Sequence, residues 1–252
     1  MKTQTFRMFP FATRQVAPLL LAALFAAAGP TRAGLTEGLV AYDRADYAVA
    51  MKELKPLAEG GNAKAQYRLG KMANLGQGQP RDKKEAAKWF HLAAKQGLAE
   101  AQGALGYLCL VGEGVSQNND LALEWTRKAA AQGDATAQFN LSVMYSEQFG
   151  IKKNPAESLK WLRKAADQRH VEALNALGSL YEKGQAGVKQ NPVLAYMLFD
   201  VSAEKGDSAA AAKRKALEKN ISASDIRAGK ELARQWKPGT SLAKVLGGGA
   251  SF

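Results

Sequence analysis

The sequence predicts an all-α protein, an α/α right-handed superhelical solenoid in which pairs of helices stack side by side. The first observation behind this prediction is an internal repeat. Residues 98–133 match residues 62–97 and 134–169 when shifted by 36 positions, and a fourth copy, residues 170–206, is one residue longer. The second observation is that apolar residues in each copy recur at helical spacing. A fixed period of this size indicates units that bury their apolar faces only against neighbouring units.

Each copy begins with a predicted helix that carries one apolar stripe, at positions i, i+4, i+7 and i+8. The residue after the first leucine of the stripe is Gly in three copies and Ser in the third. Because Gly inside a helix costs about 1 kcal/mol relative to Ala, its recurrence predicts close contact between helices. The stripe residues are Ala65, Leu69, Met72 and Ala73; Ala101, Leu105, Leu108 and Cys109; Ala137, Leu141, Met144 and Tyr145; and Ala173, Leu177, Leu180 and Tyr181.

The second predicted helix carries a tryptophan in each of the first three copies. Trp89, Trp125 and Trp161 stand one period apart on an apolar stripe. Such regular spacing predicts core residues rather than a ligand-binding box. We therefore expect Trp125→Ala to cost about 3–5 kcal/mol.

The ends of these second helices are marked by capping residues. Preferred N-cap types precede the helices, and Pro155 and Pro192 occupy first helical positions. Gly follows the second helix of the first, second and fourth copies, as in a usual C-terminal cap. Arg169 takes this place in the third copy and predicts a strained junction with the fourth. The predicted N-caps are Asp82, Asn118, Asn154 and Asn191, and the glycines are Gly97, Gly133 and Gly206.

The segments on either side of the repeats predict caps for the array. Residues 34–61 are expected to form an N-terminal half-repeat of two helices, the second starting at Asp46. Residues 207–236 predict a C-terminal helical cap, in which Ser222 and Asp225 resemble a capping box. Residues 237–252 include three consecutive glycines and predict a flexible tail.

Residues 1–33 have the pattern of a signal peptide. Basic residues without any acid precede a short apolar run, residues 17–28, and small residues follow it. The run is too short for a membrane helix, which needs roughly 20 residues. We expect cleavage after Ala33 or, as the second choice, after Ala28, and therefore a periplasmic or secreted protein with no transmembrane segment after cleavage.

The chain is basic, with a formal net charge of +12. A surplus of this size suits nucleic acid, an anionic envelope polymer or acidic proteins. However, Lys and Arg alternate with Glu and Asp on the predicted helices, and no basic run with interleaved aromatics appears. This pattern predicts ordinary solvated helix faces and no nucleic-acid partner. Cys109 is the only cysteine, which excludes an intramolecular disulfide and a cysteine-based zinc site.

No set of residues in the sequence predicts catalysis. Nucleophilic catalysis needs a nucleophile, a base and an orienting group, and the two histidines, His91 and His170, are expected at a surface and at a helix start. The Gly-x-Gly pairs at 76–78 and 112–114 follow helices rather than strands, so they predict turns rather than phosphate-binding loops. We expect no enzyme, no metal site and no cofactor.

The repeated frame resembles the Sel1-like repeats, which are related to the tetratricopeptide class. The frame reads Ala-x-Ala-Gln-x-x-Leu-Gly, then Gly-x-Gly-Val, then Lys-Trp-hydrophobe-x-x-Ala-Ala-x-x-Gly, and it covers residues 62–206. This resemblance implies an exported bacterial adaptor of envelope signalling, envelope maintenance or host interaction. A cysteine-rich branch of the family is linked to penicillin binding and β-lactamase activity, and this chain lacks the regular cysteine pairs of that branch.

The candidate binding surface is the concave face, which the first helices line in such solenoids. Outward aromatics are typical of interface hot spots, and basic or amide side chains near them would hold an anion. For the aromatics, partial packing between neighbouring first helices is the open alternative. Gly103 leaves room there for a side chain. The candidate residues are Lys64, Tyr67, Lys71, Asn74, Tyr107, Phe139, Asn140 and Asn175.

The function that these observations favour is a non-enzymatic adaptor or regulator that binds a protein or peptide segment along the concave face. Two alternatives stay open. One is a cell-wall-active, β-lactamase-like hydrolase, and the other is a module that binds an anionic envelope glycan.

Overall fold

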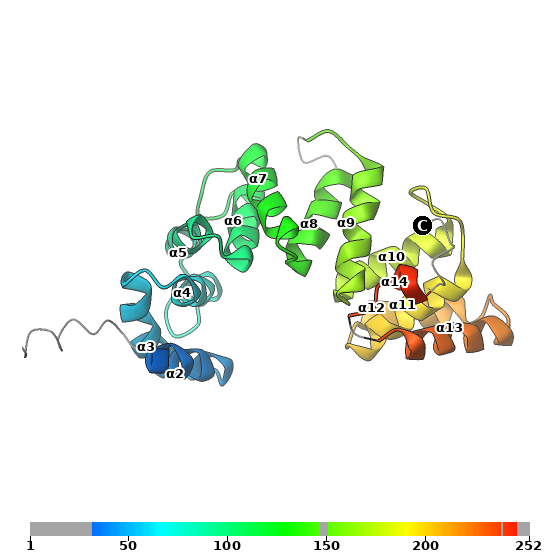
Figure 1. Cartoon of the computed structure of the whole chain (residues 1–252), viewed down its shortest axis with the longest axis horizontal. Coiled ribbons are helices and arrows are strands. Elements are labelled where there is room, and N and C mark those ends of the chain that lie inside the picture. The colour runs from blue at the N-terminus through cyan, green and yellow to red at the C-terminus, as the bar shows by residue number, and fades with distance from the viewer. Residues whose placement is uncertain (1–31, 147–150, 238, 246–252) are drawn as a thin grey trace, which may run out of the picture.

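A computed structural model describes residues 32–146, 151–237 and 239–245, and this part of the chain contains 13 helices in an arch-shaped array. Figure 1 shows α2 and α3 at one end of the arch and α10 to α14 gathered at the other. The helices are α2 (Arg32–Asp43), α3 (Tyr47–Glu59), α4 (Ala63–Leu75), α5 (Lys83–Lys95), α6 (Ala99–Val111), α7 (Asn119–Ala131), α8 (Ala135–Ser146), α9 (Pro155–Asp167), α10 (Val171–Lys183), α11 (Pro192–Glu204), α12 (Ser208–Leu217), α13 (Ala223–Gln235) and α14 (Leu242–Val245).

Consecutive helices pack as pairs, which confirms the predicted all-α solenoid. In the repeats the first helices are α4, α6, α8 and α10, and the second helices are α5, α7, α9 and α11. The predicted N-caps are confirmed: for example, Asp82 Oδ1 accepts hydrogen bonds from the backbone N–H groups of Lys84 and Glu85, at 2.8 and 2.9 Å. Asn118, Asn154 and Asn191 cap α7, α9 and α11 in the same way. Local sequence thus determines where each second helix begins.

The glycines inside the first helices allow close contact with the second helices, as predicted. A Cβ atom at Gly70 would lie 2.6 Å from the ring of Phe90, and one at Gly178 would lie 2.7 Å from the ring of Phe199. At Gly106 the nearest atom is Thr126 Oγ1, at 2.5 Å. All of these distances are shorter than real side-chain contacts, so a larger residue would force each pair apart.

The tryptophans, in contrast, are not the core residues that the sequence predicts. Trp89, Trp125 and Trp161 are half-buried, and the fully buried position is the next residue along the helix, Phe90, Thr126 or Leu162. The indole N–H needs a polar partner, and two of the rings find one on their own helix surface, in Glu85 and Glu157. Lysine ammonium groups cover two of the rings, Lys128 over Trp125 at 4.5 Å and Lys164 over Trp161 at 4.4 Å. The tryptophans therefore lie at the edge of the core, partly buried and partly exposed.

Buried glutamines link neighbouring repeats. The side-chain amides of Gln66, Gln102 and Gln138 donate to backbone carbonyls eight residues earlier, those of Ala58, Ala94 and Ala130. Their side-chain oxygens accept from Gln96, Gln132 and Gln168, at 2.7 to 2.8 Å. Because both ends of each buried amide are satisfied, these glutamines contribute to stability instead of costing it.

The loops within the first two repeats rest on the preceding helix pair. Gly78 and Gly114, the second glycines of the Gly-x-Gly pairs, have positive φ angles of 69° and 74°. A Cβ atom at Gly114 would lie 2.0 Å from the carbonyl oxygen of Lys83, the first residue of α5. A Cβ atom at Gly78 would lie 2.7 Å from Tyr47, the first residue of α3. These are turns that need glycine, as predicted, and they also pack one repeat against the next.

The junction between the third and fourth repeats holds the C-terminal segment. Arg169 has a positive φ of 59°, which confirms the predicted strain, and its guanidinium donates to the carbonyl of Trp236 and lies 5.1 Å from that indole ring. The carboxylate of Asp167 accepts from the backbone N–H of Leu242 at 2.6 Å. The sequence predicts a flexible tail from residue 237, whereas Leu242 is buried and α14 packs on the fourth repeat. Residues 238 and 246–252 lie outside the described residues.

The N-terminal end forms a helix pair; the second helix, α3, starts at Tyr47, next to the predicted start, and Asp46 caps it. The predicted signal peptide falls almost entirely on residues 1–31, which lie outside the described residues. The helix α2 begins at Arg32, two residues before the predicted half-repeat of residues 34–61. None of the helices in the described part of the chain has the length and apolar character that a membrane span requires.

Candidate functional site

The surface formed by the first helices contains a pocket of about 340 Å³. We call it the α6 pocket, because α6 forms its floor and α4 and α8 its sides. It contains three of the candidate residues, Tyr67, Tyr107 and Asn140. The other lining residues are Glu100, Gly103, Ala104, Asp134 and Thr136. All but one come from first helices, and Asp134 immediately precedes α8.

Small residues on α6 create this pocket. Gly103 stands where the other repeats carry Tyr67, Phe139 and Asn175, one period apart. Ala104 stands where the first and third repeats carry Arg68 and Asn140. The space therefore opens at the second repeat, at the residue that the sequence marks as leaving room.

The two tyrosines differ in burial. Tyr107 is 50% exposed, whereas Tyr67 is half-buried and packs against Phe90 with ring centroids 5.8 Å apart. Burial raises the pKa of the Tyr67 hydroxyl; the charge of Glu100 raises it further, Arg68 opposes this, and Asp134 adds a smaller increase. Glu100 and Asp134 are the two acidic residues that line the pocket.

The remaining candidate residues make contacts elsewhere. Lys71 lies 5.5 Å from the Tyr42 ring, towards α2, and Lys64 is exposed at the start of α4. Asn74 accepts a hydrogen bond from Lys83 at 2.7 Å, at the far end of the helix pair. Lys64 and Asn74 are thus not brought together with the α6 pocket, whereas Lys71 lies beside it, 6.0 Å from the ring of Tyr67.

Phe139 and Asn175 hold neighbouring units together. Phe139 stacks on His170, with centroids 5.2 Å apart, so it takes the packing role that the sequence leaves open for the aromatics. Asn175 donates to Asp207 and accepts from Lys213, at 2.8 and 2.6 Å. His170 stands at the N-cap of α10 but makes no capping hydrogen bond with its side chain; its ring stacks on Phe139, and its Nδ1 lies 3.3 Å from Glu172.

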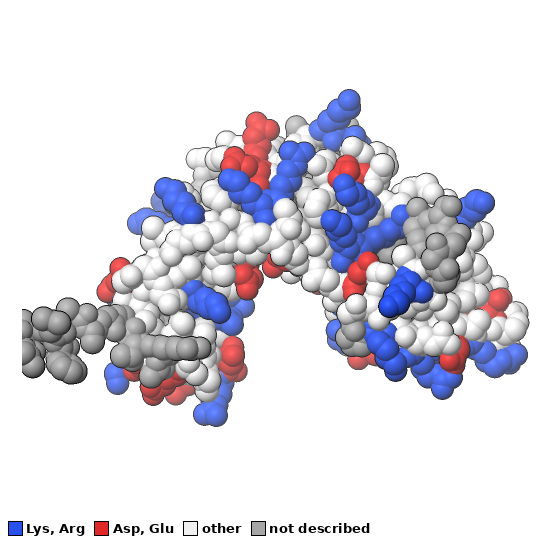
Figure 2. Space-filling view, in the orientation of Figure 1, with Lys and Arg blue, Asp and Glu red and all other residues white. Residues whose placement is uncertain are grey.

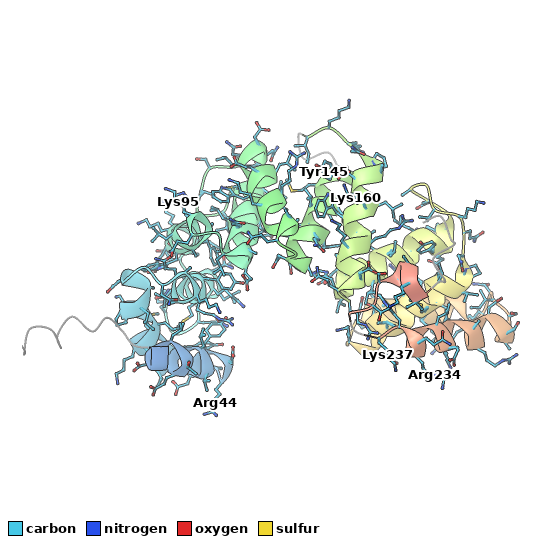
Figure 3. The ribbon with its side chains drawn as sticks, in the orientation of Figure 1. Arg44, Lys95, Tyr145, Lys160, Arg234 and Lys237 are labelled. Atoms are coloured by element: carbon cyan, nitrogen blue, oxygen red, sulfur yellow. The ribbon has the colours of Figure 1, made fainter. Side chains whose placement is uncertain are left out.

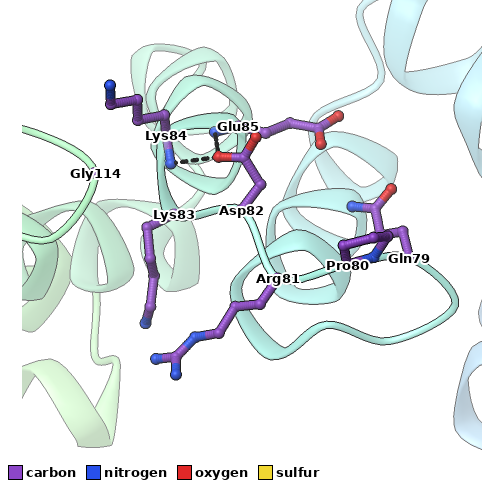
Figure 4. Close-up of a pocket in the computed structure, with 8 residues that line it drawn as sticks. All are labelled: Gln79, Pro80, Arg81, Asp82, Lys83, Lys84, Glu85 and Gly114. Atoms are coloured by element: carbon purple, nitrogen blue, oxygen red, sulfur yellow. Dashed lines mark hydrogen bonds between the residues drawn. The ribbon is translucent and has the colours of Figure 1, made fainter.

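Two further cavities lie away from these residues. One, of about 580 Å³, surrounds the start of α5; Figure 4 shows Asp82 there, occupied with the backbone of α5, and Arg81 and Lys83 side by side. Lys83 forms an ion pair with Glu113 at 2.6 Å, so this group serves the loop. The other, of about 680 Å³, is an apolar outer groove between α5 and α7, with Leu121 and Trp125 on one wall.

Catalytic chemistry has little support in these cavities. Cys109 and His91 both line the outer groove, but burial raises the pKa of the Cys109 thiol, the opposite of what a nucleophilic thiolate needs. His91 is exposed on α5. Within the described residues, no group of three or more His, Cys, Asp or Glu side chains is placed to hold a metal ion.

Charge is spread over the molecule. Figure 2 shows Lys and Arg side chains on every part of the visible face, with Asp and Glu between them, and no continuous basic band. Figure 3 shows that labelled cations such as Arg44, Lys95 and Lys160 come from separate helix pairs. A solvated basic surface fits this distribution better than a polyanion track does.

Stacked helix pairs with a pocket on the first-helix surface define a helical-repeat scaffold. Comparison with known families specifies it: the Sel1 repeat matches residues 63–98, 99–134, 135–170 and 171–207. The chain belongs to the Sel1 repeat family. No catalytic family is identified, and none of the curated proteins compared with the chain matches it.

Solved structures show the same fold. The crystal structure of c5321, a protective antigen present in uropathogenic Escherichia coli strains displaying an SLR fold, is 29% identical with a TM-score of 0.74 over 86% of this chain. This chain spans 47% of that one. A Sel1 repeat protein from Oxalobacter formigenes is 31% identical, with a TM-score of 0.65 over 80% of this chain and 82% of its own. A putative Sel1 repeat protein from Klebsiella pneumoniae subsp. pneumoniae, 17% identical, has a TM-score of 0.52 over 77% of this chain and 96% of its own.

Proposed function

We propose that this Sel1-repeat scaffold is a non-enzymatic adaptor that works in the periplasm or outside the cell and binds an extended segment of another protein. The observation that carries the proposal is the α6 pocket, a polar and aromatic recess on the first-helix surface. Its lining comes from three successive repeats, so one extended ligand would contact all three at once. Extended segments suit such grooves because alternate side chains fill separate recesses.

The proposed location rests on the N-terminal sequence. Residues 1–33 combine basic residues, a short apolar run and small residues. This combination of features supports export of the chain.

The two alternatives have less support. A hydrolase needs an activated nucleophile, whereas burial raises the pKa of the Cys109 thiol and so disfavours its nucleophilic thiolate form. An anionic glycan would meet the carboxylates of Glu100 and Asp134 in the α6 pocket, which would repel it. A protein segment is the ligand class that this pocket favours.

Site-specific photo-crosslinking tests the proposal. A photoreactive phenylalanine analogue is placed at Tyr107, on the first-helix surface, or at Leu92, on the second helix α5; the two residues are 50% and 45% exposed. In the native host, Tyr107 should give one abundant crosslinked protein, and Leu92 should give none. A crosslink from Leu92 alone would show that the partner docks on the second helices, and the proposed binding face would be wrong.

A further inference from the structure

We propose that the α6 pocket receives a Lys or Arg side chain of the partner segment, held between two tyrosines and two carboxylates. This inference rests on the proposed function and adds the chemistry of the ligand. It also reverses an expectation from the sequence, in which Lys64, Lys71 and Asn74 were the groups expected to recognise an anion.

The pocket has room for one long side chain. Its volume of about 340 Å³ is at the lower end of the range for small-ligand sites, roughly 300–1,000 Å³. Ala104 is half-exposed in its floor. Tyr107 rises from the same helix, and Tyr67 closes the side towards α4. A flexible aliphatic chain with a charged end fits such a recess, because its stem packs on the apolar floor and rings.

The carboxylates provide the charge complementarity. Among the described residues, neither Glu100 nor Asp134 forms an ion pair with a Lys or Arg side chain. Asp134 uses Oδ1 to cap α8, accepting from the backbone N–H of Ala137 at 2.6 Å. Since a carboxylate has two oxygens, the second one remains for a ligand. A guanidinium or ammonium group would complete both sites.

Aromatic rings add a second attraction. A cation is favoured over the face of a tyrosine within about 6 Å of its centroid. The protein already uses this contact nearby: Arg68 and Lys71 lie 4.8 and 5.5 Å from the Tyr42 ring, and both lie 6.0 Å from Tyr67. The first-helix surface is therefore basic towards α2 and acidic towards α8. A segment that carries an acidic residue followed in space by a basic one would match this order.

The remaining titratable neighbour does not compete for the carboxylates. Burial lowers the pKa of His170, which stacks on Phe139, although Glu172 and, less strongly, Asp134 oppose that effect. The lowered pKa favours the neutral imidazole, which a carboxylate attracts less than a cation.

Amide NMR with small probes tests the inference on the full folded chain. Nα-acetyl-arginine N-methylamide should shift the amides of Gly103, Ala104 and Asn140 in a saturable way. The citrulline analogue has the same shape without the charge, and it should bind at least about tenfold more weakly, which corresponds to 1.4 kcal/mol. Equal binding of the two probes, or no saturable shift with the arginine probe, would overturn the inference.

Matched variants locate the effect. Glu100→Gln and Asp134→Asn should each weaken the arginine probe about three- to tenfold, and Asn preserves the cap of α8. The control is Glu172→Gln, two repeat periods after Glu100. Both glutamates lie in a first turn whose N-cap makes no side-chain hydrogen bond, and Glu172 lies outside the pocket lining, 3.3 Å from His170 Nδ1. It should bind the probe like the wild type. Equal weakening in all three variants would mean a long-range charge effect and no site.

The two proposals can fail separately. If Tyr107 crosslinks a partner while the arginine probe does not bind, the adaptor function stands and the ligand chemistry is wrong. If only Leu92 crosslinks a partner, the proposed binding face is wrong whatever the probe does. A dimer seen by light scattering that dissociates in Glu100→Gln would identify a second copy of this chain as the occupant, and the partner inference would fall.

Discussion

The first three repeats and the C-terminal part of the molecule bury their residues in different ways. In α5, α7 and α9 the buried residues lie on one side, and the tryptophans stay half-exposed. In α11 nine consecutive residues, from Leu194 to Ser202, are all buried. The cause is that α10, α12 and α13 all pack on α11. The repeats are thus a thin, linear core, and the C-terminal part is a small globular one.

The polar links between units differ in the same way. Gln66, Gln102 and Gln138 each bond to a second glutamine from the same repeat unit and to the preceding second helix. In the fourth repeat Leu174 takes the place of the first glutamine, and Lys205 takes the place of the second. The missing link is therefore the one between the third and fourth repeats. There the buried Leu174 belongs to the same apolar cluster as Ala165 and Ala166 of α9, so apolar burial replaces the polar link.

The largest expected effect is in the globular part. Phe199 is fully buried over Gly178, so Phe199→Ala should cost about 3–5 kcal/mol of unfolding free energy. Trp125→Ala should cost only about 1–2 kcal/mol, because its ring is half-buried. Urea unfolding of both variants measures the two costs. Equal costs would show that the two regions do not differ in this respect.

The next effect concerns the glutamine links. Gln102→Leu removes the hydrogen bond to the Ala94 carbonyl and the one from the Gln132 side chain, so it should destabilise the protein by about 1–3 kcal/mol. The double variant Gln102→Leu with Gln132→Lys copies the fourth repeat. It should recover at least about 0.5 kcal/mol of that loss, as a double-mutant cycle measures. If the losses of unfolding free energy of the two single variants add up to that of the double variant, the two side chains are not coupled.

A smaller effect is expected where the two regions meet. Arg169→Ala keeps the positive φ and loses the contacts with Trp236, whereas Arg169→Gly loses the same contacts and relieves the backbone. The Gly variant should therefore be more stable than the Ala variant by about 1 kcal/mol, as thermal unfolding measures. If the Ala variant were the more stable one, the backbone at this junction would not be strained.

The smallest effect is a pH dependence in the cap. Burial acts to raise the pKa of Asp207, but hydrogen bonds from Ala210, Asn175, Ser202 and Ala209 outweigh it, so the folded pKa lies below 3.8. A lowered pKa stabilises the fold above the unfolded value, and this stabilisation is lost as pH falls through the folded value. The stability difference between wild type and Asp207→Asn should therefore shrink on acidification. A difference that stays constant with pH would contradict the assignment.

Features set by local sequence were predictable, and features set by distant contacts were not. The N-caps at Asp82 and Asn118 follow from neighbouring residues in the chain, and the close contact at Gly70 follows from the recurrence of a small residue in every copy. The half-exposure of Trp125 does not, because a stripe at helical spacing cannot say whether Trp125 or Thr126 points inward. The packing of Leu242 depends on Asp167, 75 residues away.

The candidate site was predictable in the same partial way. The sequence places Tyr67, Tyr107 and Asn140 on the first-helix surface, and Gly103 signals the space between them. It does not show that Phe139 turns onto His170, because that stacking joins two different repeats. The sequence identifies Asp134 only as the start of a repeat. The small residues at 103 and 104, close to an acidic residue, are nevertheless a pattern from which an acidic pocket could be predicted.

The contact of Gly114 with Lys83 has a mechanical consequence. A loop whose backbone touches the first turn of the preceding unit limits how closely the two units can approach at that point. Gly78 and Gly114 make two such contacts, one for each of the first two repeats. The spacing between successive recesses along this part of the array is thereby set in advance. The fixed distance between recesses would then select ligands by the spacing of their side chains, and insertion of one residue at either loop would change that distance.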